Sequence, residues 1–258
     1  MAAQLGKVAP AVVRWRNNVP LGVGDLESRA VNLSIVIPVL NEAANITTAL
    51  VALQPLRERG AEIIVVDGGS SDDTFTFAGS HGVRTTTAAR GRATQQNAGA
   101  QIATGDTLLF LHIDTRTPDN VDALIGVALT EGNAVWGRFD VTLAADGSRS
   151  HLMLKVIAAT MNFRSRMTGI ATGDQCIFVR KSVFDNVGGF PDIPLMEDIA
   201  LSKALKKISA PACLHEHVTT SARRWQKHGV WRTMVLMWWL RFAYWVGVSP
   251  MKLAAWYR

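Results

Sequence analysis

Acidic side chains stand at three points of the chain where they could take part in chemistry. Asp67 and Asp114 each end an apolar run, and the pair Glu197-Asp198 opens a later helical pattern. Carboxylates can hydrogen-bond a nucleoside, ligate a divalent metal or take a proton from a hydroxyl group. Three such sites on one scaffold suggest nucleotide-sugar chemistry, with one site for the nucleoside, one for a metal on the diphosphate and one for proton removal from the acceptor.

The first acidic site lies in the segment VDGGSSDDT. Asp67 is followed by Gly68 and Gly69, which would let a ligand approach the backbone closely. The alternative is a plain turn between a strand and a helix, in which Ser70 or Ser71 caps the helix.

The second acidic site combines Asp114 with His112. Mg²⁺ and Mn²⁺ prefer oxygen ligands and often take one or two carboxylates plus substrate phosphates, which makes Asp114 the best metal candidate. His112 would lie on the same side if the strand continues that far, where it could join a Mn²⁺ shell or hydrogen-bond the diphosphate. The alternative is a capped strand end.

Arg92 lies in a basic segment at the expected start of a helix, where a phosphate would be favoured. The alternative for this segment is a solvated helix face. The pair Glu197-Asp198 also has a structural alternative, because acids at a helix N-terminus commonly interact with the helix dipole.

The elements that must position these residues alternate between strands and helices. Apolar, β-branched runs predict strands at 33–40, 62–66 and 107–114, and helices are expected at 42–58 and 92–103. This order predicts a mostly parallel sheet covered on both faces, with ligands beyond the carboxyl ends of the strands. Further elements follow: a helix after Pro118, a strand at 134–143, a helix near 151–163 and a helix starting at Glu197 or Asp198.

The composition indicates one large domain with appendages. The chain has 258 residues, 48% of them hydrophobic, which is enough for a substantial core. Cys176 and Cys213 are too few for a disulfide framework or a thiolate zinc site, and the N-terminus is a poor secretory signal, so we expect a cytoplasmic protein. We expect a loose extension at 1–31, a catalytic domain at 32–225 and an amphipathic helical segment at 226–258.

The C-terminal segment combines basic and apolar residues. The run at 229–248 is apolar but is interrupted by Arg232 and Arg241, and a spanning helix would bury Arg241 near its middle. An interfacial helix on an anionic membrane avoids that cost, which would place the protein peripherally on the inner membrane face. The alternatives are a helix packed on the catalytic domain or a dimer contact. Nucleic-acid binding would rest on the net charge of +6 alone, and we expect none.

Taken in order, six segments resemble the inverting glycosyltransferases of family 2: LSIVIPVLNEAANI, VVDGGSSDDT, GRATQQNAGA, GDTLLFLHIDT, GDQCIFVRKSVFDNVGGFP and PLMEDIALSKAL. The chain is most similar to a small bacterial subgroup, the radical-SAM/selenodomain-associated family-2-like transferases, which share the HxDT strand end and the SPxxLAxWYR ending. The resemblance implies an α/β fold of GT-A type, with a Rossmann-like, mostly parallel sheet flanked by helices and a C-terminal amphipathic helix.

The resemblance also implies roles for residues on the donor side. It assigns four residues to the nucleoside pocket: Pro38, Asn41, Glu42 and Asp67. Arg92 would approach the diphosphate. Asp114 matches the second acid of the metal-binding DxD motif, with His112 in place of the first, so Asp114 and His112 would hold Mn²⁺ or Mg²⁺.

On the acceptor side, Asp198 matches the catalytic base of the family's ED motif, with Glu197 beside it. The resemblance assigns five residues to the acceptor side: Gly173, Asp174, Gln175, Arg224 and Trp225. Arg224 and Trp225 stand with Arg223 where related enzymes have a QxxRW-like segment.

These assignments imply sugar transfer from a nucleoside-diphosphate sugar to a hydroxyl acceptor, either a lipid or a small molecule. We expect a UDP-sugar, with a GDP-sugar as the second choice. One alternative is a catalytically silent nucleotide-sugar-binding protein. Another is a sugar nucleotidyltransferase, which would need a glycine-rich, lysine-bearing phosphate loop near the first strand, where the segment IPVLNEA stands instead.

Overall fold

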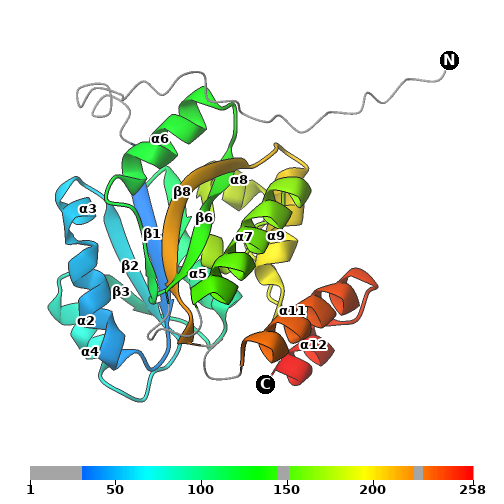
Figure 1. Ribbon diagram of the computed structural model, residues 1–258. Helices are drawn as coiled ribbons and strands as arrows, with labels where there is room; N and C mark the ends of the chain where they lie inside the picture. The colour runs from blue at the N-terminus through cyan, green and yellow to red at the C-terminus, as the bar shows by residue number, and fades with distance from the viewer. Residues whose placement is uncertain (1–30, 145–150, 224–228, 258) are drawn as a thin grey trace.

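The computed structural model describes residues 31–144, 151–223 and 229–257, and these form one mixed sheet with helices on both faces (Figure 1). In these ranges the sheet has eight strands in the order β3-β2-β1-β4-β7-β6-β8-β5. The strands are β1 (Leu33–Val39), β2 (Glu62–Asp67), β3 (Arg84–Thr87), β4 (Thr107–Phe110), β5 (Thr115–Arg116), β6 (Trp136–Ala144), β7 (Phe178–Arg180) and β8 (Ala212–Ser221). The helices are α2 (Ala43–Ala52), α3 (Gln54–Glu58), α4 (Thr74–Ser80), α5 (Arg92–Ile102), α6 (Val121–Glu131), α7 (His151–Thr168), the 3-10 turn η1 (Gly173–Gln175), α8 (Lys181–Asn186), α9 (Glu197–Lys206), α11 (Val230–Trp245) and α12 (Pro250–Tyr257).

The first half of the chain builds the parallel part of the sheet. Strand β1 pairs in parallel with β2 and β4, and β2 pairs in parallel with β3. Strand β7 joins antiparallel between β4 and β6, and β8 runs parallel to β6. The predicted mostly parallel sheet flanked by helices is therefore confirmed. Because β1, β2 and β4 are parallel neighbours, the loops that follow them meet at one edge of the sheet.

Alternate residues of β1 contribute to two separate hydrophobic cores. Ile35 and Ile37 pack with α2, α3 and α6 on one face, whereas Val36 packs with α5, α8 and α9 on the other. Helix α5 lies very close to the sheet, since a Cβ atom at Gly99 would come within 2.3 Å of the Val36 side chain. This close packing fixes the position of the N-terminus of α5, which carries Arg92.

Three predicted boundaries were wrong in ways that matter for the site. The strand predicted at 107–114 ends at Phe110, and the chain then turns, with the Thr115 N–H donating to the His112 carbonyl at 3.0 Å. The helix predicted at 42–58 is divided at Leu53, next to Pro55, which has no N–H to donate. Helix α4 begins only at Thr74, because the Ser70 hydroxyl bonds Asp67 and the Ser71 hydroxyl bonds Asn41 on the neighbouring loop, so neither serine caps the helix.

The C-terminal helices α11 and α12 lie against α7 and the start of α9 (Figure 1). Leu240, Ala243 and Leu253 are buried against Met196 and Ile199. One face of this segment thus packs on α7 and the start of α9. The opposite face is exposed. Within the described ranges, no helix combines the length and the apolar character needed to cross a bilayer.

Candidate active site

The acidic pair Glu197-Asp198 occupies the first two positions of α9. Met196 precedes it in the left-handed conformation, with φ of 71°, and so turns the chain sharply into the helix. Glu197 is buried and Asp198 is partly buried. The Asp198 carboxylate accepts hydrogen bonds from the backbone N–H groups of Gly173 at 2.9 Å and Ile199 at 2.7 Å. These bonds fix the orientation of the carboxylate.

Both acids bind protons more tightly than isolated carboxyl groups do. Burial raises the pKa of Glu197, and the charge of Asp198 raises it further. Burial also raises the pKa of Asp198, whereas the N–H of Gly173 and the charge of Arg92 act in the opposite direction. A carboxylate with a raised pKa is a stronger base, as general base catalysis requires.

The side chain of His112 lies against the turn η1. Its Nδ1 atom is 3.4 Å from Asp174 Oδ1, and a Cβ atom added at Gly173 would be only 2.7 Å from the imidazole ring. The turn is held by a capping box, in which the side chains of Thr172 and Gln175 bond each other's backbone N–H groups. Glycine at position 173 therefore allows the ring to approach the backbone that supports Asp198.

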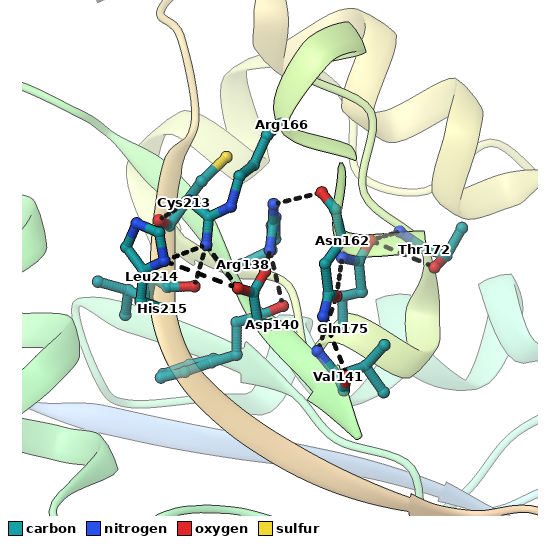
Figure 2. Close-up of polar contacts among 11 residues, drawn as sticks. Arg138, Asp140, Val141, Asn162, Arg166, Thr172, Gln175, Cys213, Leu214 and His215 are labelled. Atoms are coloured by element: carbon teal, nitrogen blue, oxygen red, sulfur yellow. Dashed lines mark hydrogen bonds and ion pairs between the residues drawn. The ribbon is translucent and has the colours of Figure 1, made fainter. Parts of the chain in front are cut away.

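A buried polar network supports η1 from behind (Figure 2). Arg138 is fully buried and donates to Asp140, which also accepts from Arg166 at 2.6 Å. Asn162 bonds the backbone of β6 and accepts from Gln175 at 3.5 Å. Gln175 is fully buried and supports the turn through its side chain. The sequence patterns did not single out the other residues of this network.

Two cavities meet at His112. The first, which we call the acid cleft, has a volume of about 170 Å³ and includes Arg92, His112, Gly173, Asp174, Glu197 and Asp198. The second, which we call the metal-side cavity, has a volume of about 490 Å³ and includes His112 and Asp114. The structure therefore brings Asp198, Arg92 and His112 together in one cleft. Asp114 lies on the other side of His112, in the second cavity.

Asp114 and His112 suit a divalent cation that takes its remaining ligands from the phosphates of a substrate. Asp114 lies in the turn after β4, with its side chain 31% exposed and its Oδ2 atom 3.7 Å from Arg223 Nη2. His112 is oriented by Asp174, as metal-binding histidines commonly are by carboxylates. The described residues contain no cluster of three or more His, Cys, Asp or Glu side chains able to bind a metal. One carboxylate with phosphate oxygens is a common arrangement for Mg²⁺, and the imidazole adds a ligand that Mn²⁺ accepts.

The residues predicted for the nucleoside lie at the ends of β1 and β2 and on the loop after β1. Asp67 accepts hydrogen bonds from the backbone N–H groups of Gly69 and Ser70, both at 2.9 Å, and Asn41 accepts from the N–H of Ser71 at 2.8 Å. The Asp67 carboxylate thus shapes the loop, and the two loops are tied side by side. Pro38 lies within β1, one residue before its end, and Glu42 lies on the loop after that strand. None of the four predicted residues lines the acid cleft or the metal-side cavity.

Two predicted acceptor residues, Arg224 and Trp225, lie outside the described residues. Their neighbour Arg223 lines the metal-side cavity and faces Asp114.

Arg164 on α7 was not among the functional residues predicted from the sequence. Its Nε and Nη2 atoms are buried without a hydrogen-bond partner among the described residues, and burial lowers its pKa while the charge of Asp198 opposes that change.

The sequence analysis also missed the apolar walls of the acid cleft. They come mainly from α7 and α11, with a contribution from the start of α9, and include Val156, Ile157, Met161, Leu195, Met196, Ile199, Met234, Met237 and Trp238. The sequence feature that could have indicated these walls is the recurrence of methionine in both helices. The same feature is equally typical of ordinary core packing.

Known structures share this fold at low sequence identity. TarS of S. aureus matches with a TM-score of 0.59 and 16% identity over 74% of this chain and 60% of that one. Glucosyl-3-phosphoglycerate synthase from Mycobacterium tuberculosis, in complex with Mn²⁺, UDP and phosphoglyceric acid, matches with a TM-score of 0.55 and 20% identity over 80% of this chain and 75% of that one. The mannosyltransferase PcManGT from Pyrobaculum calidifontis, in complex with GDP-Man and Mn²⁺, matches with a TM-score of 0.53 and 19% identity over 75% and 57%. The chain therefore spans less than two thirds of the TarS and PcManGT chains. These likenesses confirm the GT-A fold.

None of the curated proteins matches the chain in sequence. The model of the family described as "Glycosyl transferase family 2" matches residues 34–188, which hold the loops after β1, β2 and β4 and the turn η1. This match covers more than half of the chain. The protein belongs to glycosyl transferase family 2.

Proposed function

We propose that the protein is an inverting glycosyltransferase that moves a sugar from a nucleoside-diphosphate sugar to a hydroxyl acceptor. The observation that carries the proposal is the position of Asp198, which shares the acid cleft with Arg92 and His112 and is held by the N–H of Gly173. We further propose that it falls in the radical-SAM/selenodomain-associated subgroup.

Asp198 is the catalytic base in this proposal. Its carboxylate takes the proton of the acceptor hydroxyl while that oxygen forms a bond to the anomeric carbon. The bond from the anomeric carbon to the diphosphate oxygen breaks on the opposite face, and its electron pair leaves with the nucleoside diphosphate. A single displacement of this kind inverts the anomeric configuration. Arg92 stabilises the charge that develops on the diphosphate, Glu197 stands beside the base, and burial together with the charge of Asp174 keeps the pKa of Asp198 high.

On the donor side, Asp114 and His112 would hold Mn²⁺ or Mg²⁺, and Pro38, Asn41, Glu42 and Asp67 would surround the nucleoside. A bound divalent cation supplies positive charge to the leaving diphosphate. The synthase and PcManGT structures support this division, because they were obtained with Mn²⁺ and with UDP or GDP-Man, respectively. We propose a UDP-sugar as the donor, with a GDP-sugar as the alternative.

On the acceptor side we propose Gly173, Asp174 and Gln175, together with Arg224 and Trp225. We also propose that residues 32–225 form the catalytic domain and that 226–258 is a segment attached to it. The exposed face of α11 and α12 supports contact with an anionic membrane surface, since residues 229–257 contain three basic side chains, Arg232, Arg241 and Lys252, and no acidic one.

The first test is thermal stabilisation by UDP, GDP, UDP-glucose, UDP-N-acetylglucosamine and GDP-mannose, each with and without Mn²⁺ or Mg²⁺. Binding at about 100 times the dissociation constant stabilises the folded state by about 2.7 kcal/mol. We expect a metal-dependent shift with one nucleotide class that Asp114→Ala abolishes and Asp185→Ala, at an exposed position, leaves unchanged.

The second test separates the enzyme from its alternatives. Asp198→Asn should keep the metal-dependent shift but lose transfer by about 10²- to 10⁴-fold, the usual contribution of a general base. A wild-type protein that binds the nucleotide sugar without turning it over would instead be a binding protein. Formation of a sugar nucleotide from a nucleoside triphosphate and a sugar phosphate would identify a nucleotidyltransferase.

A further inference from the structure

The acid cleft has a polar floor and apolar walls. The floor consists of Arg92, His112, Asp174, Glu197 and Asp198. The walls come mainly from α7 and α11, and they present aliphatic, methionine and tryptophan side chains, with Thr160 and Arg241 as polar members. Ligand sites commonly bind apolar parts of a molecule with such walls and orient it with a few polar groups. This cleft therefore fits a molecule that has one reactive polar end and an apolar remainder.

We infer that the acceptor is an amphipathic alcohol, whose hydroxyl group meets Asp198 and whose apolar chain lies between α7 and α11. The inference rests on the proposed function, because it takes Asp198 to be the base. Four methionines line the cleft: Met161, Met196, Met234 and Met237. Methionine is flexible and polarisable, so such a wall adapts to a chain that itself has many conformations.

The cleft also provides a route by which the chain leaves the protein. Trp238 lines the cleft and is 58% exposed, so it belongs both to the wall and to the outer surface of α11. On the other wall, Val156 lines the cleft and is 57% exposed. The cleft thus opens between two apolar rims. A fully polar acceptor would leave these rims in water without benefit, whereas an apolar chain would cover them.

The experiment uses n-alkyl β-glucosides from butyl to decyl as probes, each below its critical micelle concentration, with the full-length protein. Binding is measured by calorimetry, and sugar transfer to the same probes is measured with the donor found by thermal stabilisation. We expect affinity to rise about two- to fourfold for each added methylene, since burying one CH₂ fully would give about fourfold.

A matched pair of variants on α7 locates the chain. Val156→Glu puts a charge on the rim of the cleft, and we expect it to abolish most of the dependence on chain length. Leu152→Glu makes the same kind of change one turn earlier, at a side chain that is 79% exposed and does not line the cleft, and it should leave the dependence unchanged. Both positions are exposed enough for the fold to survive. Met237→Ala, on the opposite wall, should also reduce the affinity for the long-chain glucosides.

The outcomes separate this inference from the proposed function. Donor binding without any dependence on chain length, or equal effects of Val156→Glu and Leu152→Glu, would overturn the amphipathic acceptor and leave the transferase standing. Binding that depends on chain length without donor binding would overturn the transferase and leave the apolar site. A dimer that closes the cleft, seen as loss of glucoside binding at higher protein concentration, would also overturn the inference.

Discussion

At the scale of single residues, the raised pKa of Asp198 makes a prediction about pH. The base must be ionised, so transfer should fall as the pH drops through its pKa, which burial has raised above the ordinary value. The charge of Asp174 acts in the same direction, because two acids that lie close together repel each other. Asp174→Asn should therefore move the acid limb of the kcat/KM profile to lower pH. Glu58→Gln, at an exposed glutamate on α3, should not move it, and a shift to higher pH would contradict the assignment.

Gly173 is a single residue on which the geometry of the acid cleft depends. Gly173→Ala would force the His112 ring away from a Cβ atom at 2.7 Å and so disturb both His112 and the N–H that holds Asp198. Displacements of about 1 Å in a reacting site can cost roughly 10²-fold in rate, and we expect a loss of that order in kcat/KM. Gly79→Ala is the control, because a Cβ atom there meets nothing within 4 Å. Equal activity of the two variants would show that His112 moves without consequence.

At the scale of elements, the network joining β6 to α7 should contribute strongly to stability. Asp140→Asn leaves the buried Arg138 without its carboxylate partner, and breaking such a pair typically costs about 3–5 kcal/mol. Asp185→Asn breaks an exposed pair with Lys181, which should be worth about 1 kcal/mol or less. Urea denaturation of the two variants measures the difference. Similar midpoints would mean that the network does not hold α7 and η1.

The sequence predicted the elements better than it predicted the contacts between them. Apolar runs located β1, β2 and the start of β4, because buried parallel strands need continuous apolar side chains. The early end of β4 was missed, since LLFLHI remains apolar while the backbone turns after Phe110. The partners of Asp140 were missed for a different reason. Arg166 and His215 come from α7 and β8, and no local pattern reports pairing between elements so far apart in the chain, whereas Arg138 lies only two residues away on the same strand.

At the scale of the whole molecule, the exposed surface of α11 and α12 predicts how the protein meets a membrane. This aromatic face contains Trp231, Val235, Trp238, Trp239, Phe242, Trp245, Val246, Met251 and Trp256. Tryptophan favours the boundary between headgroups and acyl chains, and basic side chains are attracted to anionic lipids. We expect cosedimentation with vesicles of anionic phospholipid, weaker binding to zwitterionic vesicles and a loss of binding as salt rises.

Variants locate the contact on this face. Trp245→Ala removes a side chain that is 76% exposed, and burial energies of about 1.5–3 kcal/mol for large apolar side chains predict a loss of about tenfold or more in vesicle affinity. Phe75→Ala, on α4, changes an exposed aromatic side chain outside the aromatic face and should have no effect. Equal losses in both variants would place the contact elsewhere.

One side chain, His112, forms part of both the acid cleft and the metal-side cavity. Any replacement that changes its size or charge therefore reshapes two binding sites at once. A mutation of residue 112 that is selected because it admits a new sugar donor would alter the choice of acceptor in the same step, and the reverse would also hold. The two specificities of this protein would then evolve as a linked pair, and a library that separates them has to leave residue 112 unchanged.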